Sequence, residues 1–317
     1  PIFVADRTKG IVTADLPAET GDLPNEIGDI VVDPPNSPWG FDTNEIAHAY
    51  GIDELYDQGY DGTGSNLCVV AGATFRYKDL QTFWQSFGVE RDNPIVVELM
   101  EPIVTRYIET QLDTEWFGGM APGANFRVYE GPDSRNTSMV YVFNETISLN
   151  WCEVITDSFA HREDSEPRLV REQYDIAAMV GAALGQTIVA ASGDSAKPDT
   201  PSASSYVTAV GGTRLFMNGL NVTNEVAWDR SGSGITKSFA LPWYQQDWVD
   251  DSNGKRAVVD VSLAASPWSP YWVRYLGEWK LYGGTSFSAP VFAGPLDEQL
   301  GRTEVRITSA PYPILAG

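Results

Sequence analysis

Short apolar runs alternate with stretches of helical periodicity through the middle of the chain. Such alternation is typical of an α/β domain, in which helices flank a mainly parallel central sheet. In an open sheet of this kind the functional site lies outside the carboxyl ends of the strands, so we expect it in the loops that follow the apolar runs. The apolar runs are residues 67–71, 126–129, 153–156 and 187–191, and the helical stretches are residues 43–50, 79–87, 104–117 and 168–184.

The two ends of the chain differ from this middle. Residues 1–40 are rich in Pro, Asp and Gly, and we expect them to form an extended N-terminal arm that lies on the domain. After residue 205, β-rich and turn-rich segments follow without a linker, so residues 41–317 are predicted to form a single domain. No apolar run has transmembrane length, because the longest, residues 176–191, is interrupted at Gly185 and predicts a helix, a turn and a buried strand.

The chain is strongly acidic. It carries 43 acidic and 21 basic side chains in 317 residues, a formal net charge of −22. This charge repels phosphate backbones and anionic membrane surfaces, so we expect neither nucleic acid nor a membrane as a partner. Near pH 4 about half of the carboxyl groups would be protonated, which would nearly balance the cations and suit a protein that works in acid.

The cysteines and the glycosylation sequons are informative about the cellular compartment of the protein. Cys68 and Cys152 are the two cysteines, and both lie in apolar runs. Two cysteines exclude a disulfide framework and a Cys-rich metal site, and we expect buried thiols, although the sequence does not show whether they meet. Sequons at Asn136, Asn144 and Asn221 agree with secretion.

The segment Tyr282-Gly-Gly-Thr-Ser286-Phe-Ser-Ala-Pro290 has the features of a nucleophile loop. Its glycines allow a sharp turn, and Pro290 suits the first turn of a following helix, which would place Ser286 at a strand-to-helix junction. A helix N-terminus also favours developing negative charge. The pattern predicts a serine nucleophile, and an ordinary helix-capping serine is the alternative.

A serine nucleophile needs a base, and the usual base is histidine. The chain has two histidines, His48 on an early amphipathic helix and His161 in a charged run. Neither has the glycine-flanked setting of a subtilisin-type catalytic histidine, so we expect both to be structural or solvated. A subtilisin-like enzyme that uses His48 is kept as a third interpretation.

A different base is offered by Glu109 and Asp113, which lie four residues apart in a helical stretch and therefore on one face. Because like charges at this spacing repel, one carboxyl group should hold a proton while the other ionises, which suits acid/base catalysis at low pH. A solvated helix face is the alternative.

A third feature is the apolar run that leads directly into Gly193-Asp194. In an acyl-transfer site, a hydrogen-bond donor to the oxyanion could lie here, and only a protonated Asp can donate. An Asp that caps the next turn is the alternative.

Together these residues resemble the sedolisins, or serine-carboxyl peptidases. The motif Glu-x-x-Leu-Asp-x-Glu is found at residues 109–115, the Ala-x-Gly-Asp motif ends at Asp194, and Gly-Gly-Thr-Ser ends at Ser286. The resemblance covers roughly residues 40–292 and implies a subtilisin-like fold. Lesser matches are found at residues 121–124, 208–213, 228–234, 241–245 and 256–261.

The resemblance implies a role for each matching residue. Ser286 would be the nucleophile, Glu109 its base and later its acid, Asp113 the partner that orients Glu109, and Asp194 the oxyanion donor. Asp199 falls where some relatives have an acidic residue in the substrate pocket. The segment that looks like the strand that pairs with the substrate backbone is Ser231, Gly232, Ser233 and Gly234.

The chain departs from the family pattern in two places. Many relatives bind calcium through a C-terminal segment, but the last acidic residues here are Asp297, Glu298 and Glu304, too few for a cation that takes six to eight oxygens. We therefore expect no cofactor and no metal site. Ala71 and Phe159 stand where some relatives have Glu and Trp. This difference argues against a proton network that extends beyond Glu109 and Asp113.

The sequence therefore predicts an acid-acting serine peptidase that cleaves peptide or denatured protein substrates as a monomer, secreted or in an acidic compartment. An inactive sedolisin-like homologue that binds peptides or proteins is the alternative, suggested by the missing tail and the altered strand positions.

Overall fold

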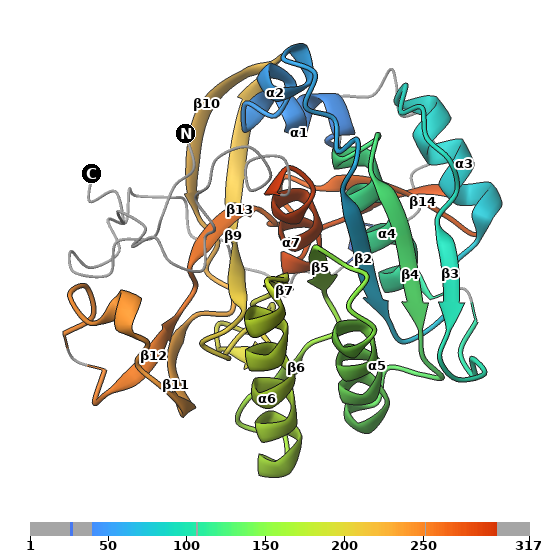
Figure 1. The fold of residues 1–317 in the computed structure, drawn as a ribbon. Coiled ribbons are helices and arrows are strands. Elements are labelled where there is room, and N and C mark those ends of the chain that lie inside the picture. Colours follow the sequence, from blue (N-terminus) through green and yellow to red (C-terminus); the bar gives the residue numbers. More distant parts are fainter. Residues whose placement is uncertain (1–25, 28–39, 106, 251, 297–317) are drawn as a thin grey trace.

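A computed structural model describes residues 26–27, 40–105, 107–250 and 252–296. Each of the four periodic stretches of the sequence forms a helix, and Figure 1 shows the helices around the central sheet. The helices are α1 (Thr43–Ala49), α2 (Asp53–Asp57), α3 (Tyr77–Ser86), α4 (Ile108–Met120), α5 (Asn136–Ser148), α6 (Arg168–Leu184) and α7 (Thr285–Ala293).

Seven of the fifteen strands in the described residues lie after residue 205, where the turn-rich sequence predicts a β-rich segment. The strands are β1 (Glu26–Ile27), β2 (Asn66–Ala71), β3 (Ile95–Glu98), β4 (Asn125–Glu130), β5 (Val154–Asp157), β6 (His161–Arg162), β7 (Thr187–Ala191), β8 (Asp199–Thr200), β9 (Thr208–Asn218), β10 (Asn221–Ala227), β11 (Gly234–Ala240), β12 (Lys255–Val258), β13 (Val261–Ala264), β14 (Tyr271–Tyr275) and β15 (Glu278–Tyr282).

In the described part of the chain, the central sheet has eight strands in the order β10-β9-β7-β5-β2-β4-β3, with β13 beside β9. Every neighbouring pair is parallel except β10 and β9. The strands β2, β5 and β7 are buried along almost their whole length, which requires cover on both faces of the sheet. The expected α/β class with a mainly parallel sheet is confirmed.

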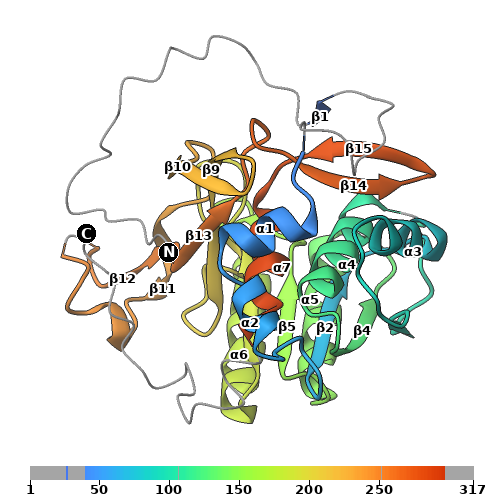
Figure 2. The ribbon, with the colours of Figure 1, turned by 90° about the horizontal axis from the view of Figure 1, so that it is seen from above.

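The helices supply that cover in two layers. The helices α5 and α6 pack against each other on one side, and α4 and α7 pack together on the other, as Figures 1 and 2 show. The helix α7 also contacts β5, β7, β9 and β13. Because α7 begins with the Ser286 segment, this packing brings Ser286 close to the carboxyl ends of the central strands.

Two local signals decide where helices begin and end. At the start of α1, the Asp42 carboxylate accepts from the Glu45 N–H at 2.8 Å while the Glu45 carboxylate accepts from the Asp42 N–H at 3.1 Å, which is a capping box. At the end of α6, Gly185 adopts a left-handed conformation with φ of 84°. The predicted sequence of helix, turn and buried strand over residues 176–191 is therefore confirmed.

The predicted N-terminal arm lies mostly outside the described residues. Of residues 1–40, the structure describes Gly40 and the two-residue strand β1, which pairs antiparallel with β15. The boundary at residue 41 stays a prediction.

The two cysteines are bonded, so the expectation of buried thiols was wrong. Cys68 lies on β2, Cys152 lies two residues before β5, and the disulfide joins them across these neighbouring strands. The bond closes a segment with a sequence separation of 84 residues. Closing a loop of this length stabilises the fold by about 4.5 kcal/mol, mainly by restricting the unfolded chain. A structural disulfide is typical of proteins in oxidising compartments.

Candidate active site

Ser286 is the second residue of α7, and its hydroxyl lies at the helix N-terminus. Gly284 precedes the helix with φ of 154°, and a side chain there would bring a Cβ within 2.8 Å of the Asp194 Oδ2. This close approach requires glycine. The helix ends after Ala293, before Gly294-Pro295.

Pro290 lies in the second turn of α7, one turn later than expected. Because proline has no N–H, it cannot donate to the carbonyl oxygen of Ser286 four residues earlier. That carbonyl oxygen instead accepts from the Ser158 hydroxyl at 3.4 Å, directly after β5. The backbone of the nucleophile is therefore tied to the end of a central strand.

Glu109 lies in the first turn of α4, and Asp113 lies one turn later. Glu109 is half-buried, and burial raises its pKa to about 7 although a hydrogen bond with the Ser286 side chain lowers it. The charge of Asp194 raises it further. Asp113 is fully buried, and burial raises its pKa well above the usual range, helped by the charge of Glu109 and opposed by a weak contact with Ser158.

Asp194 follows β7 and is held by the start of α7. Its Oδ1 accepts from the Thr285 N–H at 2.8 Å and from the Thr285 hydroxyl at 2.9 Å. The same hydroxyl accepts from the Gly193 N–H at 3.0 Å. Burial raises the pKa of Asp194, although the Thr285 bonds and the charge of Arg230 lower it. The arrangement fixes Oδ1 and leaves Oδ2 as the oxygen that can carry a proton.

The structure thus brings three separate sequence motifs to one place. The Ser286 side chain contacts Glu109, Glu109 and Asp113 repel one another on α4, and the charge of Asp194 reaches Glu109. Buried carboxyl groups whose pKa values are raised near a hydroxyl are a recurring mark of acid/base sites.

The histidines lie elsewhere. The His48 Nδ1 pairs with the Asp53 carboxylate at 2.5 Å on the surface, and α1 contacts the far end of α4, where Thr43 lies against Gly119. Ten residues of helix put that end about 15 Å from Glu109. His161 pairs with Thr200 between β6 and β8, and burial lowers its pKa. A base role for His48 is therefore not supported by the geometry.

Asp199 lies beside Asp194, on the other side of Gly193. Its side chain packs so closely that a Cβ at Gly193 would lie 2.2 Å from the Asp199 Oδ2. Burial raises the pKa of Asp199 to about 7, and the charge of Asp194 raises it further.

The Ser231–Gly234 segment lies against the loop that contains Gly193, but some of its polar groups already form hydrogen bonds within the fold. The Ser231 hydroxyl accepts from the Gly212 N–H at 2.8 Å, and the Gly232 N–H donates to the Gly193 carbonyl oxygen at 2.6 Å. Ser233 and Gly234 line a surface hollow of about 270 Å³. The last two residues are therefore the better placed of the four to meet a ligand.

Sequence reasoning missed Asp157, the last residue of β5. It is fully buried, and its charge acts on Asp113 while the charge of Glu109 acts on it. Ala71 and Phe159, where the chain departs from the family pattern, carry no acidic group. The cluster of carboxyl groups extends instead through Asp157, a position that the resemblance to the family did not single out. The signal was present, because an acidic residue directly follows a buried apolar strand at the functional edge of the sheet.

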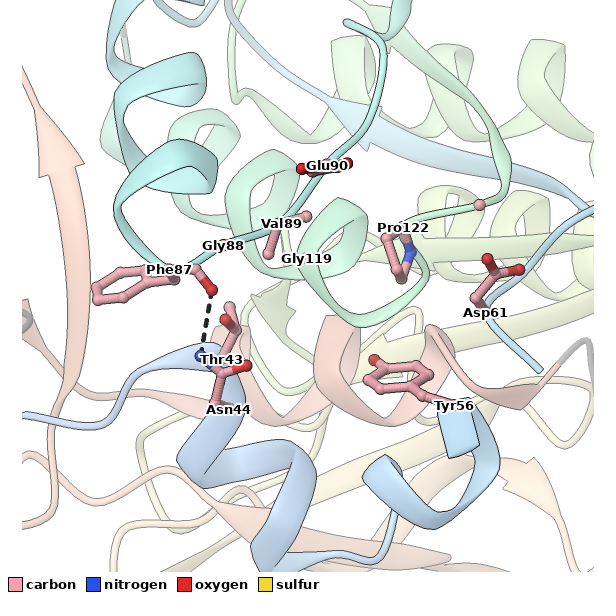
Figure 3. Close-up of a pocket in the computed structure, with 11 residues that line it drawn as sticks. Thr43, Asn44, Tyr56, Asp61, Phe87, Gly88, Val89, Glu90, Gly119 and Pro122 are labelled. Carbon is pink, nitrogen blue, oxygen red and sulfur yellow. Dashed lines mark hydrogen bonds between the residues drawn. The ribbon is translucent and has the colours of Figure 1, made fainter. Parts of the chain in front are cut away.

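A second hollow, of about 440 Å³, lies at the opposite end of α4 (Figure 3). A hydrogen bond from the Asn44 amide to the Phe87 carbonyl oxygen, 3.1 Å long, crosses it. None of the predicted site residues lines it. The lining residues are Thr43, Asn44, Tyr56, Asp61, Phe87, Gly88, Val89, Glu90, Gly119, Pro122 and Gly123.

Among the described residues, no three His, Cys, Asp or Glu side chains are grouped so that they could hold a metal ion. The acidic residues Asp297, Glu298 and Glu304 lie outside the described ranges. Within those ranges, too, no helix is both long enough and apolar enough to cross a membrane.

Comparison with known proteins agrees with this geometry. The chain is 30% identical to kumamolisin of Bacillus sp. (strain MN-32) over 305 residues, which is 84% of this chain and 54% of kumamolisin. It is 25% identical to sedolisin of Pseudomonas sp. (strain 101) over 281 residues, 76% of this chain and 48% of sedolisin. The chain thus spans about half the length of these curated relatives. Tripeptidyl-peptidase 1 of Rattus norvegicus is 31% identical over 221 residues, 60% of this chain and 38% of that protein.

A solved structure shows the same fold. Pseudomonas sedolisin, a serine-carboxyl proteinase complexed with two molecules of pseudo-iodotyrostatin, superposes with a TM-score of 0.71 at 22% identity, over 84% of this chain and 83% of that chain. No family model matches the chain. The sequence relatives and the shared fold nevertheless agree, and the chain belongs to the sedolisin family.

Proposed function

We propose that the chain is an acid-acting serine-carboxyl peptidase that hydrolyses peptide bonds through an acyl-enzyme on Ser286. The observation that carries this proposal is the contact of the Ser286 side chain with Glu109, beside carboxyl groups whose pKa values burial raises. Similarity to Pseudomonas sedolisin, a serine-carboxyl proteinase, supports the same reaction. Kumamolisin and tripeptidyl-peptidase 1 support peptides as substrates.

The residues divide the work of acyl transfer. Glu109 accepts the proton of the Ser286 hydroxyl as its oxygen attacks the carbonyl carbon, and later gives that proton to the leaving amine as the C–N bond breaks. A water molecule then attacks the acyl-enzyme while Glu109 accepts its proton, and Glu109 returns that proton to the Ser286 oxygen as the ester bond breaks and the product acid leaves. Asp113 stays protonated beside Glu109 and orients it. The protonated Oδ2 of Asp194 donates to the oxyanion.

The pH optimum follows from two opposite requirements. Glu109 must be ionised, and its pKa is about 7, whereas Asp194 must be protonated, with a pKa that burial raises from its usual value. The form that meets both requirements is most populated midway between the two pKa values, whichever group ionises first. We propose that this midpoint lies below pH 7, in agreement with a secreted enzyme or one in an acidic compartment.

Asp194→Asn tests this assignment. The amide donates to the oxyanion at every pH but less well than an acid, so we expect a weaker enzyme whose activity no longer falls on the alkaline side. The loss in kcat should be smaller than the roughly 10²–10³-fold loss that follows removal of an oxyanion donor. The measurement is cleavage of a denatured protein from pH 2 to 8 by wild type and variant. A wild-type protein without turnover would point to the peptide-binding homologue instead, and a variant with an unmoved alkaline limb would contradict the donor role.

A further inference from the structure

Asp157 lies at the centre of the carboxyl edge of the sheet. It is the last residue of β5, opposite Val70 of β2 and Ala190 of β7, and its side chain is fully buried. A carboxyl group in such a position is costly unless it is neutral or well hydrogen-bonded. The groups that hydrogen-bond or neutralise Asp157 therefore affect the catalytic site beside it.

The surroundings of Asp157 favour its protonated form. Its Oδ1 accepts from the Phe159 N–H at 2.9 Å, a bond that lowers the pKa and so opposes the larger effect of burial, whereas its Oδ2 has no hydrogen-bond partner among the described residues. The titratable groups that act on it are acids from every side. These are Glu109 and Asp113 on α4, Glu166 in the loop before α6, and Tyr174 on α6.

Glu166 is the second acid of this interior. Its Oε1 accepts from the Asn136 amide at 3.1 Å, and its Oε2 has no partner among the described residues. Arg171 is close, but it donates to the carbonyl oxygens of Glu163 and Glu166 at 2.8 and 2.6 Å. Burial raises the pKa of Glu166 to about 7, with the charge of Glu163 adding to it and Thr200, Arg171 and Asn136 opposing it.

The two acids lie at the ends of one loop, residues 158–167, which we call the β5–α6 loop. Its first residue, Ser158, donates to the Ser286 carbonyl oxygen, and the Phe159 ring lies 6.0 Å from the Tyr107 ring. Its strand β6 pairs with β8, which contains Asp199. The loop thus contacts the nucleophile, the start of α4 and the acidic residue beside Asp194.

We propose that Asp157 is a positioning residue: with Glu166, it holds the β5–α6 loop against the catalytic residues while it is protonated, and releases the loop when it ionises. The inference rests on the proposed function. The protonated acid keeps the Phe159 N–H bond without adding a charge beside Glu109. The ionised acid is repelled by the charges of Glu109 and Glu166, and the loop is the part that can move.

Two substitutions at Asp157 separate the hydrogen bond from the charge. Asp157→Asn keeps an acceptor for the Phe159 N–H and is neutral at every pH, so we expect its loss of activity toward pH 7 and above to move upward by about half a pH unit or more. Asp157→Val keeps neither, and its kcat at pH 4 should fall about tenfold below that of Asp157→Asn, because Ser158 is no longer held. Asp57→Asn, an exposed carboxyl group on α2, is the matched control and should leave the pH profile unchanged.

A readout without catalysis keeps this test separate from the proposed function. In a Ser286→Ala background, we measure the free energy of unfolding in urea as a function of pH. The midpoint pH of its decrease should rise in Asp157→Asn. Glu166→Gln should raise it too, by a smaller amount. Should Asp157→Asn prove too unstable to purify, the Glu166 variant carries the test alone. An unchanged midpoint and an unchanged pH profile in the neutral variants, or an Asp157→Val enzyme as active at pH 4 as Asp157→Asn, would overturn the proposal.

Discussion

Ser286→Ala is expected to lower kcat for peptide hydrolysis by about 10⁶-fold, the size of loss seen when a serine nucleophile is removed from a catalytic triad. The loss should appear in kcat and in kcat/KM alike, because the hydroxyl forms its bond only as the transition state is reached. The fold should survive, since the Ser286 hydroxyl contacts Glu109 and supports no packing. Kinetics with a denatured protein substrate at pH 4 measures the effect.

The control lies two residues further along the same helix. Ser288 is fully buried, and its hydroxyl donates to the Thr285 carbonyl oxygen at 2.9 Å. Ser288→Ala removes a hydroxyl from α7 without removing the nucleophile, so it should keep most of the activity at a cost of about 1 kcal/mol in stability. Full cleavage by Ser286→Ala would exclude Ser286 as the nucleophile.

Stability is expected to fall steeply as the pH rises from about 4 to above 7. Burial raises the pKa of Glu109, Glu130, Glu166 and Asp199 to about 7. Between the unfolded and the folded pKa values, the folded protein binds more protons than the unfolded chain, so the free energy of unfolding decreases with pH. The free energy of unfolding is therefore highest below about pH 4, where these acids are protonated in both states. It falls until they are ionised in the folded protein, above about pH 7.

The size of the effect is large for a single domain. A buried carboxyl group whose pKa rises from its usual value to about 7 lowers the free energy of unfolding by on the order of 3 kcal/mol once ionised. The acids that interact with one another do not contribute independently. Asp133 has the opposite sign, because its bonds to Arg135 lower its pKa, so its contribution is lost only as the pH falls in the acid range.

Urea unfolding of the Ser286→Ala protein from pH 3 to 8 measures this profile without self-cleavage. Glu130 lies at the end of β4, where burial and the charge of Glu98 raise its pKa. Glu130→Gln should therefore flatten the profile, whereas the exposed control Asp57→Asn should not. A stability that is constant or rises between pH 4 and 7 would contradict the protonated state of these acids.

Much of the sheet could be predicted from hydrophobic patterning, because strands buried on both faces leave continuous apolar runs. The helix α5 was missed since its Val-Tyr-Val-Phe run, residues 140–143, has the composition of a strand, and packing against α6 overrides that preference. The disulfide was missed because β2 and β5 are adjacent in the sheet but far apart in sequence. Strand order is a tertiary property that no local pattern contains.

The candidate site divides in the same way. Ser286, Glu109, Asp113 and Asp194 could be named because each stands in a short motif whose chemistry depends on residues nearby in sequence. The role of Ser158 could not, because its hydrogen bond to the Ser286 carbonyl oxygen exists only where Pro290 frees that oxygen across the fold. Asp157 was signalled by its place after an apolar run, but its role depends on burial and on acids that are distant in sequence.

The most direct test of a serine activated by carboxyl groups is the pH dependence of Ser286 labelling by a serine-directed inhibitor, followed by mass spectrometry from pH 2 to 8. We predict modification of Ser286 at a rate that is greatest below pH 7 and declines above it, since the reactive form needs Glu109 ionised and Asp194 protonated. A rate that climbs steadily to pH 8, as imidazole activation produces, or modification of another residue would contradict the account.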